Sequence, residues 1–170
     1  MRRSCAAALA AAALLFSGSC AYTPSPALLP AHLKTIAIPV FRNETTEYNL
    51  EREITDEVIA RFVADNHLRI VGERQANALL EGRITQYKNA VFGFSTGVEA
   101  QEYRVTISVA VVLKDQVKNR EMWSEPEMVK TANYYVVDVP GQTARTEFDG
   151  RKEAISKIAE EILARTVEGW

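Results

Sequence analysis

Apolar and polar residues alternate along several segments of the chain, and this period of two predicts strands. The most regular case is residues 103–114, where Tyr, Val, Ile, Val, Val and Leu occupy every second position and mostly polar or small residues occupy the positions between them. Weaker alternation predicts strands over residues 33–41, 79–91 and 121–137, and a short strand over residues 68–72.

A period near four predicts two helices. In residues 49–65 the apolar positions are four residues apart, and Asn49 precedes them as the expected N-cap. A second helix is expected over residues 143–167, with Gly150 weakening its first part. The expected buried stripes are Leu50, Ile54, Val58 and Phe62 in the first helix, and Phe148, Ile155, Ile158, Ala159 and Ile162 in the second.

The order of these elements predicts an α+β domain. Strands that follow one another, with helices before and after them, favour a mostly antiparallel four-stranded sheet with two helices packed on one face. Residues 68–72 leave room for a fifth short strand. Pro39 and Pro126 lack the N–H that a ladder requires, so each is expected at a sheet edge, at a bulge or where pairing ends.

The N-terminal segment has the pattern of an export signal rather than of a domain. Arg2 and Arg3 precede an uninterrupted apolar run over residues 6–16, which is shorter than the roughly 20 residues of a membrane-spanning helix. Residues 1–19 are therefore expected to be a signal peptide. Residues 20–32 are expected to be a tether, because three prolines disfavour regular structure there, and residues 33–170 a single domain.

Cys20 follows small residues at the expected cleavage point, and residues 15–20 resemble a bacterial lipobox. Ser17 departs from that pattern, which prefers Leu three residues before the cysteine. Cleavage by the ordinary signal peptidase and a disulfide role for Cys20 are the alternatives, although Cys5 lies within the signal. Acylation would anchor the protein without a transmembrane helix, and Ala21, which is not Asp, favours the outer membrane over the inner membrane.

Composition and motifs argue against several classes of function. Twenty basic and 22 acidic residues give a net charge of −2, which lacks the basic excess of a nucleic-acid-binding protein. His32 and His67 have no partner at metal-ligand spacing and are interpreted as solvated loop residues. The carboxylates of residues 51–57 are spaced as a solvated helix face. We therefore expect no enzyme activity, no metal and no cofactor.

Two kinds of surface are better candidates for recognition. Phe92 and Phe94 lie in a glycine-containing segment expected to form a hairpin tip, where exposed apolar residues mark contacts with protein or lipid. The alternative is that they fold back under the sheet. Residues 134–137 form a second apolar segment. Arg104 projects from the polar face of the strongest strand and is the basic residue expected to contact lipid phosphates, unless the basic residues of this face are simply solvated.

Several segments together resemble the LptE family of lipopolysaccharide-assembly lipoproteins. The resemblance rests on residues 33–41, 50–63, 78–84, 102–107 and 165–170, in this order along the chain. It implies a lipoprotein of the outer membrane that faces the periplasm, plugs the LptD β-barrel and contacts lipopolysaccharide. Only Cys20, as the lipidated residue, is carried over from the family. The alternative is a lipoprotein accessory of another envelope secretion or lipid-transport complex.

Overall fold

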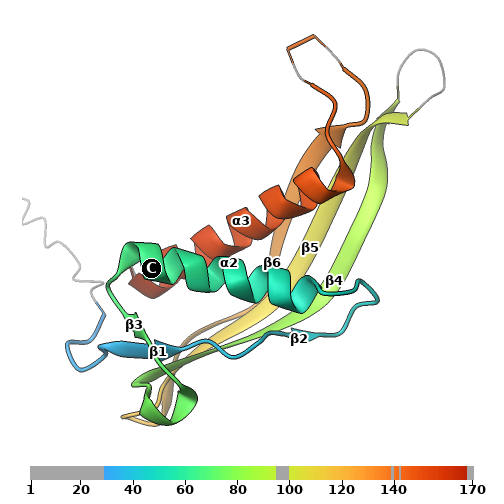
Figure 1. The fold of residues 1–170 in the computed structure, drawn as a ribbon. Coiled ribbons are helices and arrows are strands. Elements are labelled where there is room, and N and C mark those ends of the chain that lie inside the picture. The colour runs from blue at the N-terminus through green and yellow to red at the C-terminus, as the bar shows by residue number, and fades with distance from the viewer. Residues whose placement is uncertain (1–28, 95–99, 139, 142, 168–170) are drawn as a thin grey trace, which may run out of the picture.

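The computed structural model describes residues 29–94, 100–138, 140–141 and 143–167 (Figure 1). The predicted signal peptide and Cys20 lie outside these residues. The elements in chain order are β1 (Thr35–Ala37), β2 (Arg42–Asn43), α2 (Leu50–Asp65), β3 (Arg69–Ile70), the 3-10 helix η2 (Glu73–Gln75), β4 (Ala78–Phe94), β5 (Ala100–Asp115), β6 (Arg120–Tyr135) and α3 (Glu147–Val167).

The strands form one mixed sheet of six strands in the order β3-β1-β4-β5-β6, with β2 pairing further along β4. β1 is parallel to β3 and β4, and β2 is parallel to β4, whereas β4, β5 and β6 are antiparallel. The prediction of a mostly antiparallel four-stranded sheet is therefore wrong. The helix α2 carries the chain back between β1 and β3, so these strands run in the same direction. Strands of two or three residues are also too short to show a period in the sequence.

The segment predicted as one strand over residues 33–41 is divided. β1 ends at Ala37 and β2 begins at Arg42, and the pairing with β4 is interrupted around Pro39, as its missing N–H predicts. In the interruption Phe41 turns inward and is buried. Its backbone N–H donates to the hydroxyl of Thr55 in α2 over 3.0 Å, so the break in the strand is tied to the helix.

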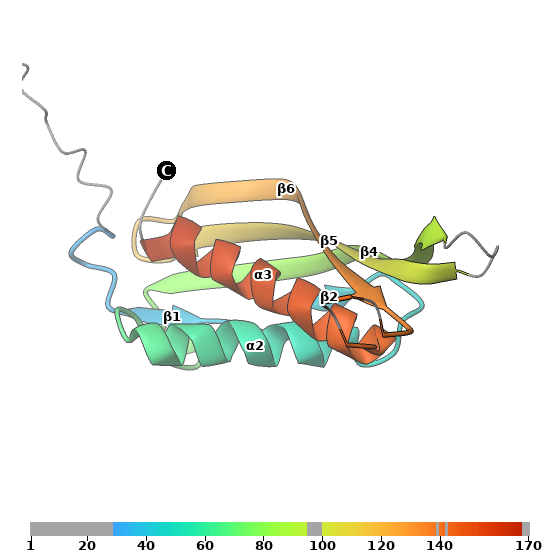
Figure 2. The same ribbon diagram turned by 90° about the horizontal axis from the view of Figure 1, so that it is seen from above.

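The two helices cover one face of the sheet (Figure 2). All four residues of the predicted stripe of α2 are buried, and so are the last four residues of the predicted stripe of α3. Phe148 is the exception: it is 57% exposed, because its side chain leaves the first turn of α3 on the side that faces α2 and solvent and not on the side that faces the sheet. Gly150, expected only to weaken the helix, is buried against Tyr134 of β6.

Asn49 precedes α2 as predicted but makes no side-chain capping hydrogen bond, since its backbone is left-handed with φ 65°. α3 begins at Glu147, later than predicted. Thr146 and Asp149 exchange hydrogen bonds there, with the Thr146 N–H donating to Asp149 Oδ2 over 2.8 Å and the Asp149 N–H donating to Thr146 Oγ1 over 3.3 Å. This reciprocal pair is a capping arrangement that fixes where the helix starts.

β5 alternates along its length as the sequence predicts, whereas β4 and β6 change phase at register shifts. Every second residue of β5 from Val105 to Leu113 is buried under the helices. The register of β6 against β5 shifts between Val109↔Met128 and Val111↔Glu125, which confirms the predicted bulge near Pro126. β4 continues to Phe94, so Phe92 and Phe94 belong to a strand and not to the turn that was expected to begin at residue 92.

Candidate partner-binding surface

The face of β4, β5 and β6 that points away from α2 and α3 is not covered by any described element (Figures 1 and 2). The residues that point to this face are mostly polar and charged, as the alternation predicts. Two of its basic residues are already neutralised: Lys114 pairs with Glu81, and Arg83 lies 3.8 Å from a carboxylate oxygen of Glu44. Lys88 makes no ion pair with a described residue. The basic residues of this face therefore differ in whether a neighbouring carboxylate already balances their charge.

Arg104 is held in a defined position on this face. Its guanidinium carbon lies 3.4 Å from the centre of the Phe92 ring, a cation–π contact between β5 and β4. Its Nε donates to Asn133 Oδ1 of β6 over 2.8 Å, and the Asn133 amide donates to Glu102 Oε1 over 2.8 Å. Residues of three strands thus orient the Arg104 guanidinium. It makes no ion pair with a described carboxylate, so its positive charge is available to bind an anionic group.

The predicted apolar surface at the end of the sheet is present in part. Phe92 is 50% exposed, and Val91 beside it is also exposed. Val136 and Val137 are exposed in the segment that follows β6, at the same end of the sheet (Figure 1). We call Val91, Phe92, Val136 and Val137 the distal apolar cluster. Of the other predicted contact residues, Phe94 has its backbone in β4, and its side chain lies outside the described residues.

Tyr134 supports this end from the helix side of the sheet. It is buried, its ring stacks on Tyr103 with 5.6 Å between ring centroids, and its hydroxyl exchanges hydrogen bonds with the amide of Asn89 at 2.9 and 3.2 Å. Burial raises the pKa of the Tyr134 phenol, so it stays neutral near pH 7. The interpretation of residues 134–137 as one exposed apolar segment is thus wrong for Tyr134, because the β6 register turns its ring inward.

The opposite end of the sheet holds the start of the described chain. His32 Nε2 lies 2.7 Å from Oδ2 of Asp115, whose carboxylate is fully buried at the end of β5. Burial alone would raise the pKa of Asp115, but hydrogen bonds from the N–H of Lys118, from His32 and from the N–H of Val117 lower it below its ordinary value. The interpretation of His32 as a solvated loop residue is therefore wrong.

His67 is an exposed residue beside Asp65, as predicted for a surface histidine. Among the described residues, no group of three or more His, Cys, Asp or Glu side chains is placed to hold a metal ion. Neither α2 nor α3 has the length and apolar content of a membrane-spanning helix.

Asn133 and Glu102 were not predicted as parts of the surface. Alternation places both on the polar face of their strands, but which residue of β6 lies beside Arg104 depends on the bulge near Pro126. A sequence does not give the size of that register shift, so the contact is visible only in the structure.

Comparisons with known proteins identify the group to which this chain belongs. The family model described as LptE, lipopolysaccharide-assembly, matches residues 33–166, and a comparison with curated proteins found no match. Solved structures share the fold at low identity. Protein XCC0632 from Xanthomonas campestris has a TM-score of 0.57 at 12% identity, with 86% of this chain and 90% of that chain covered.

Two further structures are similar to the same extent. A variant of the PelC dodecamer from Paraburkholderia phytofirmans has a TM-score of 0.53 at 16% identity, covering 85% of this chain and 96% of that chain. The protein CT253 from Chlamydia trachomatis has a TM-score of 0.52 at 15% identity, covering 78% of this chain and 94% of that chain. Likeness at this identity shows the fold alone.

The fold defines a small α+β domain with helices on one face of a mixed sheet and with the other face not covered by any described element. Because the family model spans almost all of the described domain, the chain belongs to the LptE family of lipopolysaccharide-assembly proteins.

Proposed function

We propose that this protein is a lipoprotein of the outer membrane that is anchored through Cys20, plugs a β-barrel of the LptD type and helps deliver lipopolysaccharide to the outer leaflet. The single observation that carries the proposal is the match of the LptE family to residues 33–166, which spans every described element from β1 to the last residues of α3. In this role the protein binds and positions its partners and has no catalytic function.

The bare face of the sheet supports this role. The interior of an outer-membrane barrel is polar, and the face of β4, β5 and β6 is a mostly polar surface that suits contact with it. Arg104 adds a guanidinium held by Asn133 and Phe92, and a guanidinium forms paired hydrogen bonds with phosphate groups of the kind that lipopolysaccharide carries.

The two ends of the sheet differ in what they carry. The chain enters at the end where His32 binds Asp115, and the distal apolar cluster lies at the other end (Figure 1). In this proposal a lipid on Cys20 is joined to the domain at the His32 end, so the distal apolar cluster is the end farther along the domain from the anchor.

The proposal is tested by isolating the tagged protein from membranes in mild detergent and identifying bound proteins by mass spectrometry. We expect a stoichiometric β-barrel of the LptD type. Recovery of a different envelope complex, with no barrel, would support an accessory role in another secretion or lipid-transport machine and would overturn the proposal.

A matched pair of variants locates the contact. Phe92→Ser removes an exposed aromatic ring from the distal end and is expected to reduce barrel recovery several-fold. Val117→Ser changes an exposed apolar residue in the turn at the opposite end and is expected to leave recovery unchanged. The lipid anchor is tested separately by the intact mass of the purified protein, in which the wild type is expected to carry acyl chains that Cys20→Ala lacks. A wild-type mass without acyl chains would exclude acylation at Cys20.

A further inference from the structure

The end of the sheet at which the described chain begins is rich in cations. Exposed Lys and Arg side chains gather there, and none of them forms an ion pair with another described residue. They are Lys34 before β1, Arg69 in β3, Arg74 in η2, Lys118 in the turn before β6 and Arg120 at the start of β6. We call these five residues the proximal basic patch.

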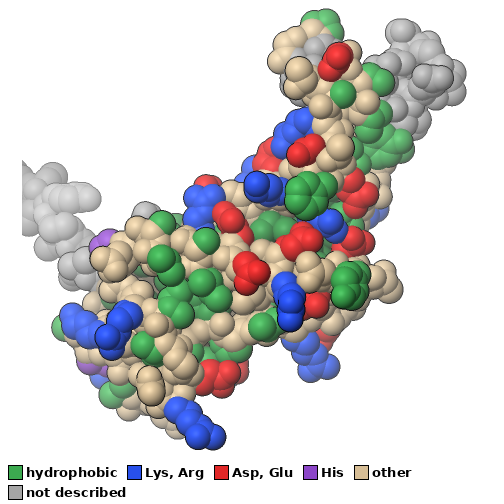
Figure 3. Space-filling view, viewed as in Figure 1, with side chains coloured by type: hydrophobic (Ala, Val, Ile, Leu, Met, Phe, Trp, Pro, Cys, Tyr) green, Lys and Arg blue, Asp and Glu red, His purple; other side chains and the backbone are tan. Residues whose placement is uncertain are grey.

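The segments that carry the patch are far apart in the sequence and meet around Asn77. The Asn77 side-chain Oδ1 accepts the N–H of Lys34 over 3.2 Å, and its backbone carbonyl accepts the N–H of Gln116 over 2.8 Å. The N–H of Arg69 donates to the carbonyl of Lys34 over 3.0 Å, and Arg74 lies just before Asn77 in η2. These contacts hold the patch together as one surface, and Figure 3 shows Lys and Arg side chains at this end, at the lower left of the view.

The carboxylates at this end do not neutralise the exposed cations. Three of them are already bound to a basic residue: Asp115 to His32, Asp65 to His67 and Glu81 to Lys114. Asp115 is also buried. The exposed carboxylates of Glu73 and Glu121 have no ion pair with a described residue, and they are fewer than the cations of the patch. The surface at this end is therefore positive, although the chain as a whole carries a net charge of −2.

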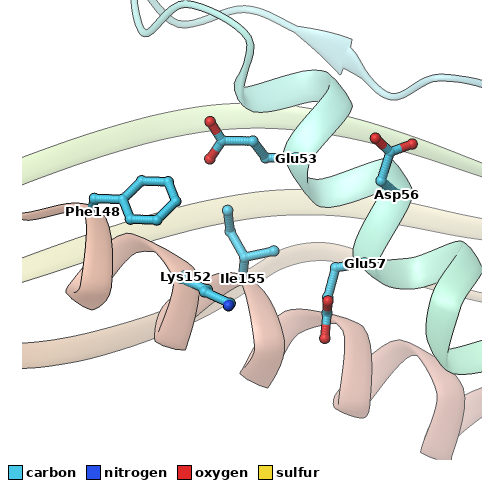
Figure 4. Close-up of a pocket in the computed structure, with 6 residues that line it drawn as sticks. All are labelled: Glu53, Asp56, Glu57, Phe148, Lys152 and Ile155. Carbon is cyan, nitrogen blue, oxygen red and sulfur yellow. The ribbon is translucent and has the colours of Figure 1, made fainter.

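The other cations that lack an ion pair within the described ranges are spread over the bare face and the helices. They are Arg52, Lys88, Arg104 and Lys152. Lys152 lies in the groove between α2 and α3, which is also lined by three carboxylates, so its charge is locally balanced (Figure 4). The gathering of unpaired cations is therefore a property of one end of the domain.

The lipid anchor proposed at Cys20 joins the domain at this same end. Leu29 packs against the core and His32 is bound to Asp115, so the described chain starts beside the patch. Cys20 precedes Leu29 by nine residues in the sequence, and a chain of this length spans at most about 30 Å when fully extended. An acylated Cys20 would therefore keep the patch within reach of the bilayer surface.

We propose that the proximal basic patch rests on the anionic phospholipid headgroups of the bilayer in which the protein is anchored. This placement rests on the lipid anchor of the proposed function and adds to it an orientation of the domain. Each Lys or Arg that approaches an anionic bilayer strengthens binding about fivefold. Val117 is 60% exposed beside Lys118, and an apolar side chain among cations favours a lipid surface over a soluble anion.

The test uses the mature lipidated protein incorporated into vesicles of phosphatidylcholine alone or of an equal mixture of phosphatidylcholine and phosphatidylglycerol. A fluorophore is attached at Val117→Cys or, at the distal end, at Val137→Cys, and a quencher is carried on the lipid headgroups. In the anionic vesicles we expect the label at residue 117 to be quenched several-fold more than the label at residue 137. The difference is expected to disappear in the neutral vesicles and in roughly 1 M salt, where the Debye length is about 3 Å.

Charge-reversed variants identify the residues responsible. Arg69→Glu combined with Arg74→Glu reverses two cations of the patch and is expected to reduce quenching at residue 117 to its value in neutral vesicles. Arg52→Glu combined with Lys88→Glu reverses two other exposed cations without an ion pair to a described residue, and is expected to behave as the wild type does. Chemical denaturation checks that both double variants are folded.

Equal quenching at residue 117 in the two kinds of vesicle, or wild-type quenching in Arg69→Glu/Arg74→Glu, would overturn the proposal. Reduced barrel recovery by this variant with unchanged quenching would assign the patch to the barrel and would also overturn it. Failure of the anchor is distinguished by sedimentation, because a protein without acyl chains would leave the neutral vesicles altogether. If such a protein still bound the anionic vesicles through Arg69 and Arg74, the contact with headgroups would stand without the anchor.

Discussion

The ring of Phe41 occupies the space that a side chain at Gly82 would fill. A Cβ built on Gly82 would lie 2.1 Å from Cε2 of Phe41, far inside van der Waals contact. The ring is buried and rests directly on the backbone of β4. Because Phe41 follows the break at Pro39, this contact joins the divided N-terminal strand to the longest strand of the sheet.

Gly82→Ala is therefore expected to lower the free energy of unfolding by about 1–3 kcal/mol, since the added methyl group must displace a buried ring. Chemical denaturation measures this loss. Gly72→Ala is the control, because nothing lies within 4 Å of a Cβ there and the backbone, with φ −66° and ψ 154°, suits any residue. It is expected to be neutral or slightly stabilising.

The same pair allows a test of the mechanism. If the clash with Phe41 is the cause, Gly82→Ala costs less in a Phe41→Leu background, where the side chain is smaller and can move away. Additive losses in the double variant would show that the damage at Gly82 comes from another source.

Gly150→Ala is expected to destabilise the protein although alanine is the better helix former by about 1 kcal/mol. A Cβ at Gly150 would lie 2.8 Å from Cδ1 of Tyr134. The Tyr134 ring has no freedom to give way, since it stacks on Tyr103 and its hydroxyl is bound to Asn89. Thermal unfolding checks the sign, and a rise in Tm would show that the ring does move.

The hydroxyl of Thr55 accepts the N–H of Phe41 and donates to the carbonyl of Glu51 over 2.6 Å. Thr55→Val keeps the shape but leaves that buried N–H without an acceptor, which is expected to cost about 1–3 kcal/mol of unfolding free energy. Thr55→Ser keeps the hydroxyl and is expected to lose less. If both variants lose the same unfolding free energy, the hydrogen bond is not the cause. The loss would then come from altered packing at this position.

The buried carboxylate of Asp115 predicts a pH dependence. Its pKa is lowered in the folded protein, so the stabilisation that follows from its charge is present above the unfolded value of about 3.9 and is lost as the pH falls through the folded value. Asp115→Asn is expected to lose about 1–3 kcal/mol at pH 7 and to show a shallower loss of stability in acid than the wild type. Unfolding curves between pH 7 and pH 2, at roughly one-unit intervals, measure both slopes.

Asp65→Asn is the control for this experiment, because Asp65 pairs with the exposed His67 at the surface. It is expected to follow the wild-type pH dependence. Parallel pH curves for Asp115→Asn and the wild type would show that the Asp115 charge contributes nothing to stability.

The sequence by itself determined the long strands, the two helices and most of the buried faces. These features follow from local periodicity, since a side chain in a regular element repeats its exposure every two or about four residues. The stripes from Leu50 to Phe62 and from Ile155 to Ile162 are buried for this reason. The capping pair of Thr146 and Asp149 was also present in the sequence, although the helix was expected to begin earlier.

Only the tertiary structure decided which segments meet. The parallel pairing of β1, the contact of His32 with Asp115 and the contact of Arg104 with Asn133 join residues far apart in the chain. Phe148 was assigned to the core by spacing alone, but the angle of α3 across the sheet leaves it beside α2 at the edge of a groove. Strand order, register and the placement of helices depend on the packing of the whole domain, and a period in the sequence carries none of this information.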